Sequence, residues 1–375
     1  MAEEEEVKKE IHKISFTSDN TMFSFGTEKG FVVCSIHPFT IMTTQDLQGG
    51  ILFAEIVANS NIIAIVGDGK NPKFPDTKLI FYDDSQSKCV SEVKFATSIK
   101  NIKVTTNDLY VLSSNTLYIF ETSTLINKDK YDTFEDNDNG VFAVSRNKRK
   151  KTFAYPDKEI GYINIVEYNK NNEKKEQKIC AHVSRIACLC ISDDSEYIAS
   201  ASDTGTLIRI FKIENGDLIY EFRRGTEKAL IFSIDFSPTN DFLSCTSDRG
   251  TVHIFNLKKK NEQPLQNIEK GFFNGLKRLL KTPSNVISAP RSFACFKIPD
   301  LKTFSVFGPD EQLFIVSADG DGKFYEVKFD KYKGGETNDA DMYNILVEDQ
   351  KTPWILKNSF YKDSFFFIII INKFI

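Results

Sequence analysis

Two adjacent arginines at the end of a predicted strand carry the most specific chemistry in this sequence. Residues 218–221 (Leu-Ile-Tyr-Glu) are typical of a strand and lead into 222–225 (Phe-Arg-Arg-Gly). Because side chains alternate across a strand, Arg223 and Arg224 are expected to point to opposite sides. Each guanidinium is a permanent cation with a planar fork of donors that suits phosphate. Gly225 is expected to allow a sharp turn or a close approach of backbone N–H groups to an anion. The pair therefore suggests two neighbouring anion sites.

Ion pairs at the protein surface are the competing interpretation of the same residues. Glu221 and Glu227 lie close to the two arginines in the sequence and offer carboxylates to them. Spacing alone favours these ion pairs over two ligand sites. The elements that position the arginines must therefore decide between the two interpretations.

Short β-rich segments separated by polar turns recur along most of the chain, whereas helical periodicity is scarce. Residues 198–211 are echoed by residues 243–255, and weaker copies lie at 23–31 and 315–324. The repeated aspartates Asp203 and Asp248 are about 45 residues apart, which is the period of a WD40-type blade. The sequence therefore predicts an all-β fold, a seven-bladed WD40-like β-propeller. It is a divergent array, because no Trp-Asp dipeptide closes the repeats.

The repeat period divides the chain into an acidic N-terminal tail, a propeller and a C-terminal tail. The tail at 1–7 lacks the apolar run of a signal peptide, the propeller is expected over 8–348, and no role is predicted for 349–375. The blades are expected near 8–46, 50–96, 97–137, 138–180, 181–224, 225–300 and 301–348.

Residues 220–225 (Tyr-Glu-Phe-Arg-Arg-Gly) resemble the FRRG motif that defines the PROPPIN family, the β-propellers that bind polyphosphoinositides. The resemblance covers roughly residues 8–335. Further segments are similar to the second, fifth and sixth blades of that family: 67–84 to the second, 181–182, 198–202 and 205–209 to the fifth, and 251–255 to the sixth.

This resemblance implies two phosphoinositide pockets, each combining an arginine with hydroxyls and an imidazole. The first would contain His182, Ser200, Ser202, Gly205, Thr206, Arg209 and Arg223. The second would contain Arg224, Gly225, Thr246, Ser247, Thr251 and His253. Ordinary hairpin polarity is the alternative explanation of the hydroxyls, and hydrogen bonds that stabilise a blade are the alternative for the two histidines.

A long insertion in the sixth blade, about 258–291, is the second functional feature. On a helix its apolar residues would share one face beside basic residues, as in an interfacial helix on an anionic membrane. The apolar residues are Phe272, Phe273, Leu276, Leu279 and Leu280, and the basic ones are Lys277, Arg278 and Lys281. A helix packed back onto the propeller is the alternative. The corresponding loop of the family is regarded as a membrane-inserting element, which favours the first interpretation.

Charge, cysteine content and missing motifs restrict the class of protein further. A net charge of −4 argues against a nucleic-acid-binding protein. The seven cysteines include no CxxC pair and indicate reduced thiols of a cytoplasmic protein. The sequence has no HExxH, P-loop or GxSxG motif, so we expect neither an enzyme nor a metal site or cofactor.

The resemblance therefore implies an effector that binds membranes containing phosphatidylinositol 3-phosphate (PI3P), phosphatidylinositol 3,5-bisphosphate (PI(3,5)P2) or both. It would be recruited peripherally to autophagosomal, endosomal or vacuolar membranes and would act there as a scaffold. Autophagy-related lipid-transfer or scaffold proteins are the implied partners. The alternative is a WD40 scaffold that recognises a protein or phosphoprotein, with the arginines contacting phosphoserine.

Overall fold

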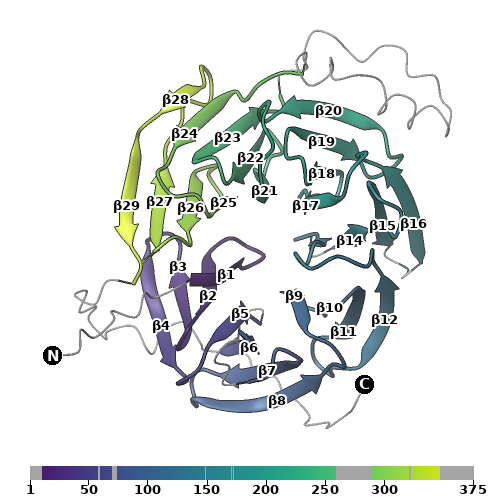
Figure 1. Ribbon diagram of the computed structural model, residues 1–375, viewed down its shortest axis with the longest axis vertical. Helices are drawn as coiled ribbons and strands as arrows, with labels where there is room; N and C mark the ends of the chain where they lie inside the picture. Colours follow the sequence, from purple (N-terminus) through teal and green to yellow (C-terminus); the bar gives the residue numbers. More distant parts are fainter. Residues whose placement is uncertain are drawn as a thin grey trace. The chain divides into compact units, whose positions relative to one another are not determined.

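The computed structural model describes residues 11–57, 60–69, 74–147, 149–169, 171, 173–258, 289–320 and 322–346. Its strands form seven sheets (Figure 1), and the fold is the seven-bladed β-propeller that the repeats predict. The acidic tail 1–7, most of the insertion with all five of its apolar residues, and residues 349–375 lie outside the described residues. No helix among the described residues has the length and apolar character needed to cross a bilayer.

The first three sheets are antiparallel meanders of four strands each. The first contains β1 (Ile11–Phe16), β2 (Met22–Thr27), β3 (Gly30–Ser35) and β4 (Thr40–Asp46). The second contains β5 (Ile51–Ile56), β6 (Ile62–Gly67), β7 (Lys78–Asp83) and β8 (Lys88–Lys94). The third contains β9 (Ile99–Val104), β10 (Asp108–Ser113), β11 (Thr116–Glu121) and β12 (Asn127–Asp132).

The next two sheets are also four-stranded and antiparallel. The fourth contains β13 (Ala143–Val144), β14 (Lys151–Pro156), β15 (Tyr162–Tyr168) and β16 (Lys174–Cys180). The fifth contains β17 (Ile186–Ile191), β18 (Tyr197–Ser202), β19 (Leu207–Lys212) and β20 (Leu218–Arg223).

The last two sheets depart from a simple meander. The sixth contains β21 (Ile231–Phe236), β22 (Phe242–Ser247), β23 (Thr251–Asn256), β24 (Ala294–Lys297) and β28 (Gly335–Thr337). The seventh contains β25 (Thr303–Phe307), β26 (Leu313–Ser317), β27 (Lys323–Val327) and β29 (Ala340–Asn344). The parallel pairing of β28 with β24 differs from the prediction, which placed residues 301–348 together in one blade.

Two glycines explain how β28 reaches the sixth sheet. Gly334 has φ +68, and a Cβ there would lie 2.3 Å from the carbonyl oxygen of Phe293. The following Gly335 donates its backbone N–H to that same oxygen at 2.9 Å. A bulkier residue at 334 would therefore block the close approach that starts the pairing.

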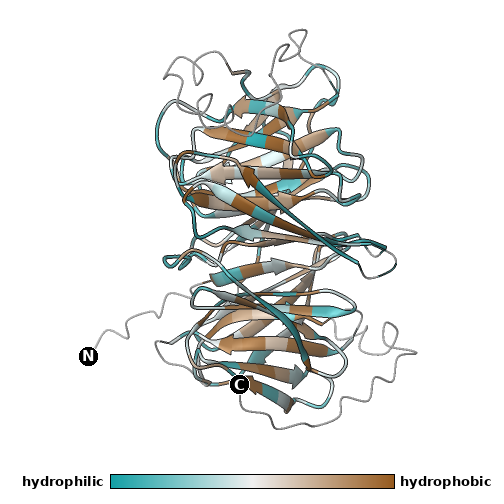
Figure 2. Ribbon diagram, turned by 90° about the vertical axis from the view of Figure 1, so that its right-hand side faces the viewer, coloured by the Kyte–Doolittle hydropathy of each residue, from teal (hydrophilic) through white to brown (hydrophobic). Residues whose placement is uncertain are grey.

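Apolar side chains on the strands form cores between neighbouring sheets. Figure 2 shows the apolar residues concentrated along the strands and the hydrophilic residues at many of the turns. The chain divides into two compact units: Met1–Tyr131, Val316–Tyr325 and Met342–Ile375 in one, and Asp132–Ile315 with Glu326–Asp341 in the other. The first unit has core clusters around Phe31 and Phe53. The second has one cluster shared by its fourth and fifth sheets and another shared by its fifth and sixth. All predicted pocket residues belong to this second unit.

Candidate anion-binding sites beside the fifth sheet

The two arginines leave the fifth sheet on different sides. Tyr220 and Phe222 pack in the core shared with the sixth sheet, so the alternate residues of β20, Glu221 and Arg223, face the other way. Arg224 follows the last residue of β20, and its guanidinium acts electrostatically on residues of the sixth sheet. The chain therefore separates the two cations, as strand alternation predicts.

Most polar groups predicted for the first pocket are bonded to one another or to the backbone. Arg209 donates from Nε to Glu221 Oε2 at 2.7 Å and from Nη1 to the carbonyl oxygen of Ala181 at 2.7 Å. His182 Nε2 lies 3.0 Å from Ser200 Oγ. Burial, together with the nearby Arg209, lowers the pKa of His182 to about 3, so the ring is neutral at physiological pH.

Arg223 differs from Arg209 in lacking such partners. It is 9% exposed, and its guanidinium has no hydrogen-bond or ion-pair partner among the described residues. Its backbone N–H donates to the carbonyl oxygen of Pro290 at 2.8 Å. A buried cation without a partner is unfavourable in the free protein, and a bound anion would relieve that cost.

Among the described residues, Arg223 and Arg224 do not form the surface ion pairs that compete with a ligand site. Glu221 binds Arg209, and the carboxylate of Glu227 lies 3.7 Å from Arg249. Arg224 does contact Glu227, but its guanidinium donates to the backbone carbonyl of Glu227 and not to the carboxylate. The simple pairing that spacing favours is therefore wrong.

The second group is built around Arg224, which is 8% exposed. Its Nε donates to the carbonyl oxygen of Gly205 at 2.8 Å and its Nη2 to that of Glu227 at 2.5 Å. Burial and the positive charge of Arg224 lower the pKa of His253 to about 4. His253 Nδ1 lies 3.1 Å from Ser292 Oγ. Arg224 is thus held in place by backbone carbonyls and leaves the neighbouring imidazole uncharged.

The hydroxyls predicted for the second pocket lie on two faces of the sixth sheet. Ser247 follows Leu243 and Cys245 on the face of β22 that packs against the fifth sheet, and its buried Oγ has no hydrogen-bond partner among the described residues. Thr251 and His253 alternate with Phe255 on that same side of β23.

Thr246, in contrast, faces the seventh sheet. Its Oγ1 donates to the carbonyl oxygen of Thr303 at 2.6 Å and lies 2.9 Å from Ser233 Oγ. The structure therefore brings Ser247, Thr251 and His253 to the side of Arg224, and it uses Thr246 to join two sheets.

The glycine that the site requires sterically is Gly205 rather than Gly225. Gly205 has φ +62, and a Cβ there would lie 2.1 Å from the carbonyl oxygen of Ala229. Gly225 has no positive φ, and a Cβ would meet nothing within 4 Å. Thr206 accepts the backbone N–H of Arg224 at 2.9 Å through its carbonyl oxygen. The turn after β18 thus holds the segment that carries Arg224.

Sequence reasoning missed Thr204 and Ser292, and it offered Glu221 to Arg223 and Arg224 rather than to Arg209. Glu221 precedes Arg223 by two strand positions, so alternation alone could have placed it on the same face. Thr204 Oγ1, 2.9 Å from Ser202 Oγ, is a second local partner. Ser292 reaches His253 through the pairing of β23 with β24, which no local pattern reveals.

The family of the chain follows from comparison with known proteins. The sequence profile described as PROPPIN matches residues 11–338. The chain belongs to the PROPPIN family. This membership accounts for the seven sheets of the propeller.

Curated relatives and a solved structure agree with this membership. SVP1-like protein 2 of Pichia angusta is 34% identical over 256 residues, which are 67% of this chain and 71% of the relative. SVP1-like protein 2 of Neurospora crassa is 30% identical over 251 residues, 66% of this chain but 56% of that longer relative. Autophagy-related protein 18e of Arabidopsis thaliana is 29% identical over 88% of this chain and 87% of its own length. Hsv2 of Kluyveromyces lactis has the same fold, with a TM-score of 0.67 at 18% identity over 90% of this chain and 98% of its own.

Proposed function

We propose that this PROPPIN propeller is a phosphoinositide-binding effector. In this proposal it recognises PI3P, PI(3,5)P2 or both at two sites, one on each side of the fifth sheet. Arg223 with Arg209, His182, Ser200, Ser202, Gly205 and Thr206 forms the first site. Arg224 with Gly225, Ser247, Thr251 and His253 forms the second, with Thr246 as its support from the neighbouring sheet face.

The state of Arg223 is the observation that carries this proposal. Arg223 is 9% exposed, and the described part of the chain supplies no partner for its guanidinium. A guanidinium can donate two parallel hydrogen bonds to a phosphate group. The hydroxyl of Ser247, for which the described residues supply no partner, supports the second site in the same way. The neutral imidazoles of His182 and His253 can still donate one hydrogen bond each.

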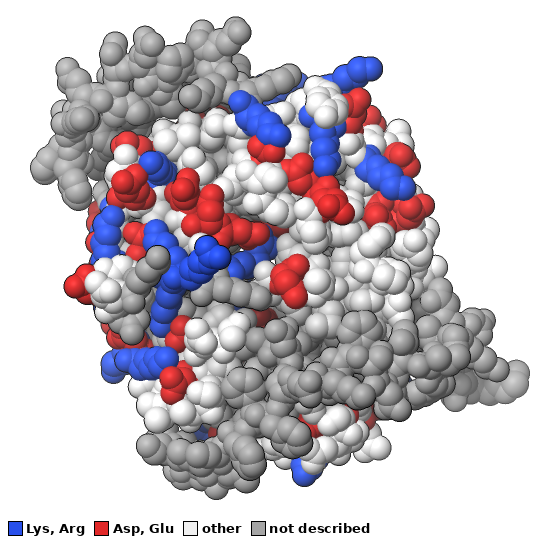
Figure 3. All heavy atoms as spheres, turned by 180° about the vertical axis from the view of Figure 1, so that it is seen from behind, with Lys and Arg blue, Asp and Glu red and all other residues white. Residues whose placement is uncertain are grey.

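A broad basic surface is not needed for this kind of recognition. On the face shown in Figure 3, basic and acidic side chains lie beside one another, in keeping with the net charge of −4. Selectivity for a phosphorylated headgroup would therefore come from the buried arginines. Attachment to a bilayer would need the apolar residues of the insertion as well.

The setting of this activity is inferred from the relatives. Two of them are named autophagy-related proteins, and one propeller of the same fold, KlAtg21, was solved with the coiled coil of AgAtg16. We therefore propose peripheral recruitment from the cytoplasm to autophagosomal, endosomal or vacuolar membranes, where the propeller binds autophagy-related lipid-transfer or scaffold proteins. Its role is binding and scaffolding.

Liposomes that differ only in headgroup test the lipid proposal. Wild-type protein is expected to sediment with vesicles containing PI3P or PI(3,5)P2 and to remain unbound with phosphatidylinositol alone. Arg223→Thr combined with Arg224→Thr should abolish that binding. Arg185→Thr is the control, because it removes an exposed cation that pairs with Asp136 at 2.8 Å. Unchanged recovery of a folded Arg223/Arg224 double variant would refute the proposal.

A further inference from the structure

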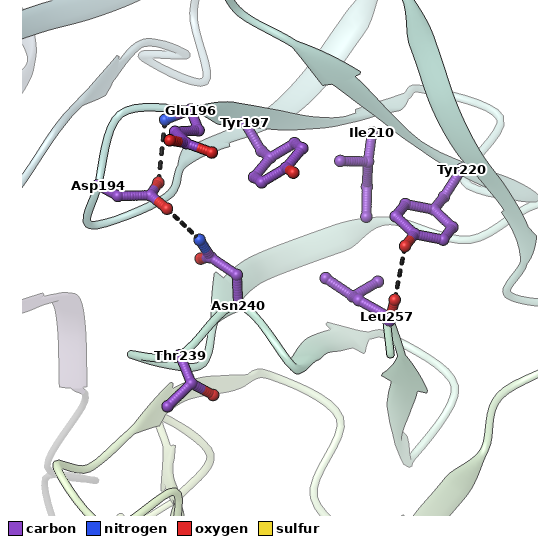
Figure 4. Close-up of a pocket in the computed structure, with 8 residues that line it drawn as sticks. All are labelled: Asp194, Glu196, Tyr197, Ile210, Tyr220, Thr239, Asn240 and Leu257. Atoms are coloured by element: carbon purple, nitrogen blue, oxygen red, sulfur yellow. Dashed lines mark hydrogen bonds between the residues drawn. The ribbon is translucent and has the colours of Figure 1, made fainter. Parts of the chain in front are cut away.

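A polar pocket lies between the fifth and sixth sheets, away from the arginine sites. Its volume is about 300 Å³, and its walls include Asp194, Glu196, Tyr197, Tyr220, Asn240 and Leu257 (Figure 4). Asp194, Glu196 and Asn240 come from the turns that precede β18 and β22. Tyr220 precedes Arg223 by three strand residues, a rise of roughly 10 Å.

Hydrogen bonds hold the walls of this pocket in place. Tyr220 donates its hydroxyl to the carbonyl oxygen of Leu257 at 2.5 Å, which fixes the ring at the border of the two sheets. Asp194 accepts from Asn240 Nδ2 at 2.5 Å and from the backbone N–H of Glu196 at 2.9 Å. The amide of Asn240 is thereby oriented, and its Oδ1 is buried with no hydrogen-bond partner in the described part of the chain.

The lining selects the charge of a ligand. Among the described residues that line the pocket, both charged ones are acids, and none is lysine or arginine. Tyr197 and Tyr220 add two aromatic rings, whose faces attract cations. Carboxylates and amide oxygens accept hydrogen bonds from a guanidinium or an ammonium group. A phosphate would be repelled by the same groups, so the pocket does not suit an inositol phosphate.

Aromatic packing separates this pocket from Arg224. The rings of Tyr220 and Phe222 stack with centroids 5.6 Å apart, and those of Phe222 and Phe255 with centroids 4.9 Å apart. These rings belong to the apolar core shared by the fifth and sixth sheets. A ligand in the pocket and an anion at Arg224 can therefore be bound at the same time.

We propose that this pocket binds an arginine side chain from a basic segment of a partner protein. The planar guanidinium suits it better than a lysine ammonium, because it stacks on tyrosine and donates in several directions at once. The pocket repels anionic headgroups, so its ligand comes from a protein rather than from the membrane. This proposal does not depend on lipid binding by the arginine sites.

Small arginine probes test the pocket directly. N-acetyl-arginine amide is expected to bind with a Kd on the order of 1 mM, measured by ligand-observed NMR. N-acetyl-citrulline amide has nearly the same shape without the charge and should bind at least tenfold more weakly. Equal binding of the two probes would overturn the proposal.

Two variants of the protein test whether the arginine probe binds in this pocket. Glu196→Gln should lower the affinity for the arginine probe about fivefold, which is the effect of losing one exposed carboxylate contact. The matched control is Glu214→Gln, which removes an exposed carboxylate paired with Lys212, outside the pocket. An equal loss in both variants, or no loss in Glu196→Gln, would place the arginine elsewhere and overturn the assignment.

The source of the cation is distinguished by comparing a peptide with a free amine. A Gly-Arg-Gly peptide should bind at least as tightly as the amide, because a partner segment must enter with its backbone attached. Spermidine is the probe for a free cation. Tighter binding of spermidine than of the peptide would overturn the choice of a protein partner.

Discussion

The contrast between the two arginines predicts that they differ in their contribution to stability. Arg224→Ala removes the hydrogen bonds to Gly205 O at 2.8 Å and Glu227 O at 2.5 Å. Arg223→Ala removes no side-chain hydrogen bond recorded among the described residues. Two variants with the same change in charge and size should therefore have unequal free energies of unfolding.

The magnitude follows from the bonds that are lost. A hydrogen bond from a charged group contributes about 1.5–3 kcal/mol. The bond to Gly205 is buried and the bond to Glu227 is partly exposed, so we expect Arg224→Ala to cost about 2–4 kcal/mol. For Arg223→Ala the lost packing of the aliphatic stem is offset by removal of an unpaired buried cation, and we expect a change within about 1 kcal/mol.

Thermal unfolding followed by circular dichroism measures this difference. At about 2 °C per kcal/mol, the Tm should fall by about 4–8 °C in Arg224→Ala and by less than about 2 °C in Arg223→Ala. Arg185→Ala serves as the control for loss of an exposed cation and should behave as Arg223→Ala does. Equal destabilisation by Arg223→Ala and Arg224→Ala would refute the reasoning, because it would show that Arg223 has a structural partner.

Three further predictions concern pH, the insertion and stoichiometry. The pKa of His182 is about 3 in the folded protein and near 6.5 when unfolded, so its contribution to stability is complete above pH 6.5 and declines as the pH falls toward 3. Urea unfolding between pH 7 and 5 should show a shallower decline of the free energy of unfolding in His182→Asn than in the wild type. The same dependence on pH in both proteins would contradict this. Phe272→Asp with Phe273→Asp should prevent attachment to vesicles, since two buried phenyl groups contribute a few kcal/mol, at ~25 cal/mol/Å². The same double variant should leave the binding of soluble headgroup nearly unchanged. An equal loss of vesicle attachment and headgroup binding would indicate that the loop is structural. Calorimetry with soluble headgroup should give two weak sites per chain, and vesicle affinity should rise more than linearly with the fraction of phosphoinositide; one headgroup per chain would exclude the second site.

Much of the fold could be predicted from the local periodicity of the sequence. The repeat of about 45 residues predicted blades, and each four-stranded meander lies within its expected range, because hairpins form between neighbouring segments. The seventh range was the exception: residues 335–337 cross to the sixth sheet, a pairing that depends on the close approach of Gly334 to Phe293. Nothing in the local alternation of 301–348 indicates that contact.

The candidate site shows the same division between local and long-range information. Alternation along β20 correctly separated Arg223 from Arg224, and resemblance to a family supplied the residues around them. The resemblance did not show that Thr246 donates to Thr303, since that bond joins two sheets through residues 57 positions apart in the chain. The positive φ and the close carbonyl contact occur at Gly205 rather than at Gly225, and the contact was not foreseen because only the folded chain places Ala229 against Gly205.

By itself the sequence determined the strand pattern, the number of blades and the position of two cations on opposite faces of one strand end. These features depend on the period of two along a strand and on a repeat that recurs within one chain. The tertiary structure decided which cation has partners. Arg209 donates to Glu221 and Arg224 donates to two backbone carbonyls, whereas the buried Arg223 has no side-chain partner among the described residues. Hydrogen bonding depends on distances of about 3 Å between groups remote in sequence, and only the packed sheets set those distances.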